Sequence, residues 1–533
     1  MILFKVLSII KKYVWVFVCF FLFVGCGSLH ENNTQNSIYP QRVTVEGDKF
    51  IDENGRHVIL NGINVVCKNK AEQYLYKGGP EFYKLLKEQG FNSIRFVIIW
   101  DGLEPEPGVY NEEYLKEIDK RIEWAKENNL FVILDMHQDL FSVNYSDGAP
   151  EWATLNEGKE HVTGVIWSDA YMMSEAVQTA FDSFWENKPA SDGIGIQDHY
   201  AQLWKYIAKR YANNPTVIGY DIMNEPFAGS SAKLGMNAML KAYGELVYKK
   251  QSKILSEEEI LMVWGDENQR LKALNLLSSA ENYSFVIDAL YNYNHRFETT
   301  FLQDMYQRVA DKIREVDDKS ILFLEHSYFS NTGVKSSIKR VNLADGTPDP
   351  LVAYAPHGYD LVTDTKDAAS ANSERVSFIF NRIKEKGQEL GMPIWLGEWG
   401  AYYNDADEII PVAQYAVSLI EQSLFGNAYW SYYSGLENDG YFKDALLRPY
   451  AAYTSGTLME YEFDRSNSQF YMRWQENEKV SAPTVIFIPN LSKLNKDQLP
   501  LGSSISSITN TGSGWLTIES SGGEKERELE LAL

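Results

Sequence analysis

Short apolar runs alternate with segments of helical periodicity along most of the chain. From residue 59 onward, eight runs of five to seven residues are typical of buried strands, and segments 114–127 and 200–211 carry apolar residues at helical spacing. The eight runs are 59–64, 93–98, 131–135, 217–223, 321–325, 352–357, 394–398 and 428–432. Eight strands joined by crossover helices predict an α/β fold, a (β/α)8 TIM barrel. An open flavodoxin-like sheet is the alternative, but no glycine-rich phosphate turn follows the first run.

The pattern differs on both sides of this alternating region. Residues 43–55 alternate around two turns and predict a small hairpin that plugs the bottom of the barrel. After Arg448, several runs separated by turns predict an antiparallel β-sandwich, a structural partner of the barrel rather than an independent binding module. We therefore expect the barrel to occupy residues 39–448 and the C-terminal β-sandwich residues 449–533.

The first 25 residues have the pattern of an export signal. Three lysines precede the apolar run 13–24, which is too short for a comfortable membrane span. Gly25-Cys26 closes this run and resembles the lipobox of bacterial lipoproteins, in which the cysteine is acylated and begins the mature chain. We expect residues 1–25 to be a lipoprotein signal peptide and Cys26 to be lipidated. A plain signal peptide or an uncleaved anchor remains the alternative.

A polar segment separates this cysteine from the folded part of the chain. Residues 26–38 predict a flexible tether. The lipid anchor would attach an exported protein to a bacterial membrane. Gly27, where bacterial sorting patterns can have aspartate, favours the outer membrane or the cell surface.

Composition narrows the possible partners. The formal net charge is −23 and the acidic residues are spread along the chain, which argues against nucleic acid. The aromatic share of 14% suits a cleft that binds sugars or lipids. Of three cysteines, Cys19 lies in the signal and Cys26 would carry lipid, so Cys67 is left as a buried small hydrophobe. We expect a monomer.

Two glutamates follow apolar runs that lie far apart in sequence. Asn224-Glu225-Pro226 comes after the fourth run, and Glu398 ends the seventh. A parallel barrel gathers its catalytic groups where strands end, so the two carboxyl groups are expected to meet. Cleaving a glycosidic bond with retention needs two carboxyl groups about 5 Å apart. The pair predicts a glycosidase, although glutamates at strand ends also serve as caps or ion-pair partners.

Each glutamate would need its own environment. Glu225, as the acid, must hold a proton near neutral pH, which requires apolar cover or a nearby carboxylate. Glu398, as the nucleophile, must be ionised, and Arg95 at the end of the second run is the cation expected beside it. Arg95 serving only as a structural ion pair is the alternative.

Further polar residues follow the third and sixth runs. Asp135, His137 and Asp139 suit the recognition of sugar hydroxyls. Zinc is the rival interpretation, but no second histidine stands at ligand spacing and His357 alone would have to complete the site, so we expect no metal and no cofactor. His357 and Tyr359 are expected to orient the nucleophile or the sugar.

Two connections are much longer than usual. Residues 141–199 and 227–320 would shape the site, because long insertions after barrel strands commonly do so. Most of the aromatic residues in the first insertion are expected to fill small cores, and some to form an apolar wall beside the cleft.

Two other classes of function make different demands on the sequence. A Ser-His-Asp hydrolase would need Gly-x-Ser-x-Gly at a strand-to-helix junction, and that motif is absent there. A non-catalytic carbohydrate-binding lipoprotein would need no protonatable acid.

The motifs around the two glutamates are similar to those of the retaining glycoside hydrolases of clan A, family 5, where Asn-Glu-Pro carries the acid/base and Gly-Glu-Trp or Gly-Glu-Phe the nucleophile. Within that family, segments 61–65, 135–142 and 395–400 resemble the endoglycoceramidases. The resemblance implies release of an intact oligosaccharide from ceramide by double displacement, through a covalent glycosyl-enzyme. It assigns Glu225 as acid/base and Glu398 as nucleophile. In the sugar subsite it places Arg95, Asp135, His137, Asp139, Asn224, His357, Tyr359, Trp430 and Lys68.

The expected substrate is a glycosphingolipid or another amphiphilic glycoside. A ceramide carries two long chains and needs an apolar surface, which the insertion 141–199 would provide. A lipid anchor would hold enzyme and glycolipid near one surface. An exo-acting glucosylceramidase or steryl β-glucosidase, or an endo-β-glucanase, of the same family remains the alternative.

Overall fold

The structure is a computed structural model that describes residues 38–533, except residues 165, 364, 366, 403–406 and 509–511. The predicted signal peptide, Cys26 and residues 27–37 of the predicted tether lie outside the described residues. In the described part of the chain, none of the helices combines the length and hydropathy needed to cross a membrane.

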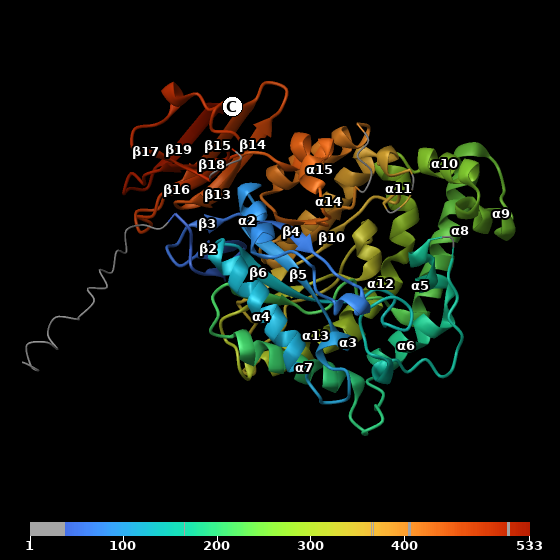
Figure 1. Cartoon of the computed structure of the whole chain (residues 1–533). Coiled ribbons are helices and arrows are strands. Elements are labelled where there is room, and N and C mark those ends of the chain that lie inside the picture. Colours follow the sequence, from blue (N-terminus) through green and yellow to red (C-terminus); the bar gives the residue numbers. More distant parts are fainter. Residues whose placement is uncertain (1–37, 165, 364, 366, 403–406, 509–511) are drawn as a thin grey trace, which may run out of the picture. The chain divides into compact units, whose positions relative to one another are not determined.

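A curled sheet of nine parallel strands forms the centre of the fold, in the order β10-β11-β12-β4-β5-β6-β7-β8-β9 (Figure 1). The strands are β4 (Asn61–Val65), β5 (Ser93–Ile99), β6 (Phe131–His137), β7 (Val217–Asp221), β8 (Ile321–Leu324), β9 (Val352–Tyr354), β10 (His357–Gly358), β11 (Trp395–Gly400) and β12 (Gly426–Trp430). Each of the eight predicted runs contributes, and the predicted TIM-barrel class is confirmed.

The sixth predicted strand is divided into β9 and β10 at Ala355-Pro356. Proline has no N–H to give to a ladder, so regular pairing stops there. The broken strand still joins its neighbour, because the Tyr354 N–H donates to the Pro393 carbonyl at 3.0 Å and the Gly397 N–H donates to the Pro356 carbonyl at 2.9 Å. With β12 paired to β4, these bonds close the sheet.

Amphipathic helices cover the outside of the barrel. They include α2 (Pro80–Glu88), α4 (Glu112–Glu127), α7 (Ile196–Tyr211), α13 (Gln303–Arg314), α14 (Ser373–Leu390) and α15 (Ile409–Ser423). In α4, the Asn111 side chain caps the first turn, and Leu115, Ile118 and Ile122 form one buried stripe at helical spacing. The predicted helical segments 114–127 and 200–211 therefore lie in α4 and α7.

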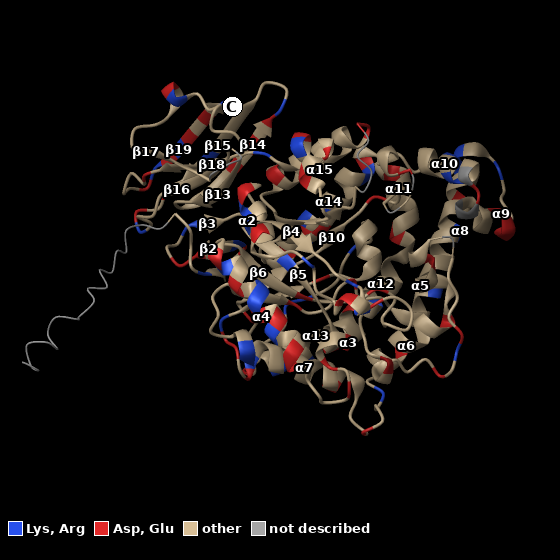
Figure 2. Ribbon diagram, in the orientation of Figure 1, with Lys and Arg blue, Asp and Glu red and all other residues tan. Residues whose placement is uncertain are grey.

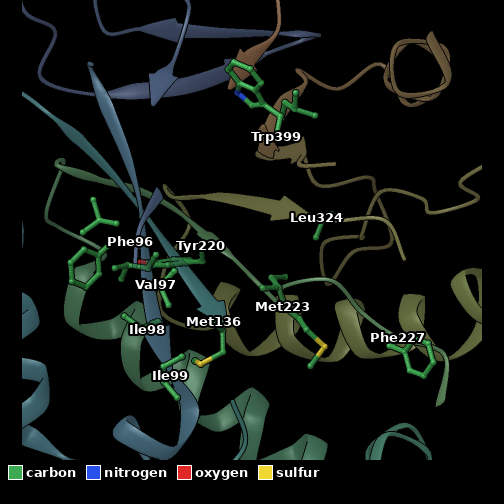
Figure 3. Close-up of a cluster of buried hydrophobic side chains, with 14 of the residues drawn as sticks. Phe96, Val97, Ile98, Ile99, Met136, Tyr220, Met223, Phe227, Leu324 and Trp399 are labelled. Carbon is green, nitrogen blue, oxygen red and sulfur yellow. The ribbon is translucent and has the colours of Figure 1, made fainter. Parts of the chain in front are cut away.

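The barrel strands are buried along their whole length. Every residue of β5 and β6 is buried, as expected where helices cover one face and the barrel interior the other. Phe96 and Ile98 of β5 lie with Met136 of β6 in the hydrophobic cluster of Figure 3. Because side chains alternate along a strand, Arg95 is placed on the opposite face of β5, toward the barrel interior.

Both long connections carry helices of their own. The first contains η3 (Trp167–Asp169), α5 (Ala170–Met173) and α6 (Glu175–Trp185). The second contains α8 (Ala232–Gln251), α9 (Glu257–Gly265), α10 (Glu267–Leu276), α11 (Ala280–Ile287), η5 (Asp288–Leu290) and α12 (Tyr291–Phe297). As expected for core-filling aromatics, Phe181 and Phe184 are fully buried, whereas Trp167 is partly exposed.

Antiparallel sheets make up the C-terminal part. One sheet has the order β1-β2-β3-β13-β16-β18-β17, and a second has the order β14-β15-β19. Their strands are β1 (Val43–Glu46), β2 (Lys49–Asp52), β3 (His57–Val58), β13 (Tyr450–Thr454), β14 (Thr457–Asp464), β15 (Gln469–Gln475), β16 (Thr484–Ile488), β17 (Ser503–Ser507), β18 (Gly514–Ile518) and β19 (Glu526–Ala532).

The predicted N-terminal hairpin is present as β1 and β2, and Phe50 stacks on Phe323 of barrel strand β8, with ring centroids 6.1 Å apart. Through β3 and β13 the hairpin also belongs to the seven-stranded sheet. This sheet therefore includes residues from both sides of the expected boundary at residue 448.

Candidate active site

Glu225 and Glu398 meet at the carboxyl ends of the barrel strands. Glu225 lies just beyond β7, and Glu398 lies on β11. One ionisable oxygen of each, together with one ring nitrogen of His357, lies within 4.8 Å of the others. Nδ1 of His357 is 2.9 Å from Oε1 of Glu225 and 3.5 Å from Oε2 of Glu398. Both carboxyl groups are largely buried, and their separation suits a pair that acts on one anomeric centre with retention.

The Glu225 backbone adopts a conformation that L-residues seldom take. Its φ is 42°, in the left-handed region, and its N–H donates to Oε2 of Glu325 at 2.8 Å. This hydrogen bond holds the turn that directs Glu225 toward the cleft, and a backbone strained in this way is typical of a functional site.

Arg95 stands at the centre of a buried charge network. Its guanidinium donates to Oε1 of Glu398 at 2.6 Å and to Oε1 of Glu325 at 2.8 Å. It also donates to Oδ2 of Asp221 at 2.8 Å and lies 3.0 Å from Oδ1 of Asp135. One fully buried guanidinium thus contacts four carboxyl groups, and only a planar group with five N–H donors can do so.

Burial and neighbouring charges change the pKa values of the ionisable groups in this network. Burial raises the pKa of Glu398 to about 7, and the nearby His357 and Arg95 oppose the rise. Burial likewise raises the pKa of Asp135 and of Asp221 to about 6, against the pull of Arg95. Burial alone would lower the pKa of His357, but Glu325 and Glu398 outweigh it and raise that pKa well above its usual value. The carboxyl groups around His357 thus favour its protonated form.

Neighbouring polar groups fix the orientation of both glutamates. The Tyr359 hydroxyl donates to Oε2 of Glu398 at 2.8 Å, and the Asn331 amide donates to Oε1 of Glu225 at 2.7 Å. Asn331 is itself held by His326, whose Nε2 lies 3.0 Å from Oδ1 of Asn331. Burial lowers the pKa of His326 to about 3, so its ring is neutral.

A second polar cluster also lines the cleft. Lys68 forms an ion pair with Asp139, and its ammonium lies 4.7 Å from the centroid of the Trp430 ring. The His137 ring stacks on Trp430, with centroids 5.3 Å apart, and its Nδ1 lies 2.7 Å from Oδ2 of Asp135. His137 Nε2 is buried with no hydrogen-bond partner among the described residues.

The cleft between these groups has a volume of about 700 Å³ and two kinds of wall. Its polar wall includes Lys68, His137 and Asp139, beside the two glutamates. The apolar part of the lining comes from both long insertions and from the loops that follow β8 and β10. It contains Ile166, Trp167, Met236, Met239, Ile287, Leu290, Tyr328, Phe329 and Leu361. The first insertion was expected to supply this surface; the contribution of the second was not anticipated.

The structure brings all the predicted site residues of the described chain together. Lys68, His137, Asp139, Asn224, Glu225, Tyr359, Glu398 and Trp430 line the cleft, and Arg95, Asp135 and His357 lie directly behind it. Their individual roles remain predictions. Sequence reasoning missed Asn64, Asp147, Asp221, Glu325 and Asn331, all in contact with these residues. Asp221 lies within a predicted strand and Glu325 at the end of one. That position in the sequence could have identified both as candidate site residues.

Two of the acidic clusters in the site already hold a protein cation. Asp135, Asp221 and Glu325 converge as metal ligands would, but the Arg95 guanidinium forms ion pairs with all three. The cluster of His137, Asp139 and Asp147 likewise contains the Lys68 ammonium.

Comparison with known proteins gives the family. Residues 51–435 match the family described as cellulase (glycosyl hydrolase family 5), and residues 448–527 match the glycoside hydrolase family 5 C-terminal domain. The chain therefore belongs to glycoside hydrolase family 5, and the predicted membership is confirmed.

Within the family, the chain is similar to proteins named endoglycoceramidase. An endoglycoceramidase of Cyanea nozakii is 31% identical over 220 residues, which cover 35% of this chain and 42% of that protein. The chain thus spans about two fifths of the length of that relative. Endoglycoceramidase I of Rhodococcus hoagii (strain 103S) is 22% identical over 460 residues, covering 84% of this chain and 79% of that protein.

A solved structure supports the same fold. Endo-glycoceramidase II from Rhodococcus sp., in complex with ganglioside GM3, superimposes with a TM-score of 0.70 at 23% identity. The match covers 91% of this chain and 99% of that chain.

Proposed function

We propose that the protein is a retaining glycosidase that hydrolyses the bond between an oligosaccharide and ceramide in glycosphingolipids. The observation that carries the proposal is the carboxyl pair within 4.8 Å, in one cleft that is lined by both polar and apolar side chains. A glycosphingolipid has the same division, with a polar glycan and two apolar chains on either side of the scissile bond. The names of the similar proteins from Cyanea and Rhodococcus support this substrate class.

The reaction would proceed in two displacements. In the first, Glu398 attacks the anomeric carbon while Glu225 gives its proton to the ceramide oxygen, which leaves as an alcohol. Arg95 and Tyr359 hold the two oxygens of the nucleophile by hydrogen bonds, so one rotamer is presented to the sugar. In the second, Glu225 takes a proton from water, which attacks the glycosyl-enzyme and regenerates Glu398.

The sugar would occupy the polar wall. Trp430 offers a flat face to a pyranose ring, and Lys68, His137 and Asp139 offer donors and acceptors to its hydroxyls. The ceramide would lie against the apolar wall from the two insertions. Membrane attachment through a lipidated Cys26 is part of the proposal, since it would keep the enzyme near this substrate.

A ganglioside and glucosylceramide distinguish the proposed reaction from its rivals. We expect the protein to release an intact oligosaccharide and ceramide from the ganglioside, as the names of the similar endoglycoceramidases suggest. Mass spectrometry of the products measures this. Release of free glucose from glucosylceramide, with the ganglioside left intact, would instead identify an exo-acting enzyme.

The pH dependence of the reaction should reveal the nucleophile. Glu398 reacts only when ionised, and burial raises its pKa to about 7, so kcat/KM should fall about ten-fold per pH unit as the pH drops below about 7. This fall is the acid limb of the pH profile of kcat/KM. The Lys68 ammonium favours the ionised Glu398 carboxylate, so Lys68→Met should move the acid limb to higher pH. The matched change Lys70→Met, on an exposed lysine paired with Asp101, should leave the limb in place. A limb that does not move in Lys68→Met would contradict this assignment.

A further inference from the structure

Exposed apolar side chains are concentrated in one insertion. Among the large hydrophobic residues that are exposed in the described part of the chain, more than half lie between residues 227 and 320. Single exposed hydrophobics are ordinary on a protein surface, but a group that gathers in one inserted segment indicates a contact surface.

The strongest group lies where α8 turns into α9. Tyr248, Ile254, Leu261 and Met262 are between 55% and 80% exposed, and we call these four residues the hairpin tip. Figure 1 shows α9 beside the end of α8, at the edge of the barrel. On α9 the opposite face packs inward through Val263, so the outward leucine and methionine are not needed for the fold of the helix.

The helix that carries the tip also lines the cleft. Met236 and Met239 of α8 form part of the apolar wall, and Tyr248 lies nine residues further along the same helix. At a rise of 1.5 Å per residue, Tyr248, the tip residue that lies on α8, stands roughly 14 Å along the helix axis from Met239. One rigid element therefore joins the apolar wall to the exposed tip.

Charge distinguishes this segment from the rest of the chain. Lys249, Lys250 and Lys253 flank the tip, and Glu257, Glu258 and Glu259 open α9, so acidic and basic groups balance locally in a chain of net charge −23 (Figure 2). Each lysine has a contact at the surface: Lys249 lies 4.0 Å from the centroid of the Phe285 ring, Lys250 lies 3.4 Å from Glu281, and Lys253 lies 3.2 Å from Glu259. Exposed pairs of this kind are weak, so the ammonium groups can turn to lipid phosphates.

We propose that the hairpin tip docks on the surface of a phospholipid bilayer. The four apolar side chains enter the headgroup boundary, the lysines contact phosphates, and α8 brings the apolar wall of the cleft close to the membrane. The choice of a bilayer rests on the proposed function, because a glycosphingolipid lies in a membrane with its scissile bond near the surface. Apolar insertion drives the contact, so binding persists at high salt and on zwitterionic lipid.

A fluorescent label tests the contact directly in the full chain. Leu261→Cys receives an environment-sensitive fluorophore, with the natural cysteines replaced (Cys19→Ser, Cys26→Ser and Cys67→Ala). The matched control carries the same label at Leu501→Cys, a fully exposed leucine before β17. With phosphatidylcholine vesicles that bear a nitroxide on the acyl chain, we expect several-fold quenching at position 261 and none at position 501. Both proteins share the N-terminal segment, so binding through that segment cannot produce this difference.

A kinetic comparison tests what the docking does. Leu261→Ser with Met262→Ser should lower hydrolysis of a glycolipid in vesicles at least about five-fold, and leave hydrolysis of the same lipid in detergent micelles unchanged. Met459→Ser with Leu501→Ser exchanges the same residue types at exposed positions elsewhere, and should change neither rate.

The outcomes separate docking from the proposed function. Equal quenching at both positions, or burial of the tip by self-association of the protein without lipid, would overturn the docking proposal. If position 261 alone is quenched but no glycolipid is cleaved in vesicles or micelles, the docking surface stands and the proposed function fails.

Discussion

Replacing Glu398 by glutamine is expected to reduce kcat by a factor of roughly 10⁴ or more. Glutamine keeps the size of the side chain and can still contact Tyr359, but its amide cannot form a stable covalent bond with the anomeric carbon. The loss should be the same for every leaving group, because this group performs the attack itself. Steady-state kinetics with a glycolipid and with a nitrophenyl glycoside measure it.

Glu225→Gln should behave differently, and this contrast is the sharper part of the prediction. Loss of the acid should lower glycosidic cleavage by roughly 10²–10⁴ when the leaving group is an alkyl alcohol. It should matter far less for the first step with a nitrophenolate, which leaves without protonation, so the glycosyl-enzyme should accumulate and be visible by mass spectrometry.

A buried glutamate outside the cleft provides the control. Glu421 is fully buried and pairs with Arg448 at 2.6 Å, so Glu421→Gln should lower stability but leave kcat of the folded enzyme unchanged. If Glu398→Gln kept more than about one per cent of the turnover, or if both active-site variants depended on the leaving group in the same way, the assigned roles would be wrong.

The barrel and the carboxyl pair could be predicted because one geometric rule links them to sequence. Apolar runs followed by polar residues mark strands and their ends, and a parallel barrel converts the ends of distant strands into neighbours. Glu225 and Glu398 each stand at or near such an end, so their meeting followed from the fold class. Arg95, predicted at a strand end, is instead the third residue of β5 and reaches Glu398 through its long side chain. Lys68 stands just past the first run, and it too lines the cleft.

Of the site residues that were missed, some lack that positional signal and some have it. Asn331 bonds to Glu225 but lies in η7 (Tyr328–Thr332), in a connection whose path depends on tertiary packing. Asp147 lies in the first insertion and accepts a hydrogen bond from the Asp139 N–H at 3.1 Å. The hydrophobic periodicity of the sequence does not predict the loop that brings the two residues together. Glu325 ended a predicted strand, but its role depends on which neighbours its side chain meets.

The pairing of strands that lie far apart in the sequence could not be predicted either. The sequence indicated the N-terminal hairpin from its turns, but not that β3 would pair with β13 almost 400 residues later. Local composition sets whether a segment forms a strand, whereas its partner is selected by packing of the whole chain. The N-terminal hairpin could therefore be assigned to the barrel bottom but not to the seven-stranded sheet.

Arg95→Lys is expected to damage stability and catalysis together. Lysine has one ammonium in place of the planar guanidinium and cannot contact Asp135, Asp221, Glu325 and Glu398 at once, so some buried carboxylates lose their partner. Breaking a buried pair of this kind costs about 3–5 kcal/mol, which urea unfolding measures as a shift in midpoint. At a temperature where the variant stays folded, kcat should still be lower by about 10² or more, because Glu398 loses the bond that orients it.

Arg56→Lys separates the two effects. Arg56 is as deeply buried as Arg95 and pairs with Asp52 at 2.6 Å, but it lies in the turn after β2, away from the cleft. Its replacement should lower the free energy of unfolding and leave kcat/KM intact. If Arg95→Lys matched this control, with stability lost and turnover per folded molecule unchanged, Arg95 would be a structural ion pair only, and another group would have to keep Glu398 ready for attack.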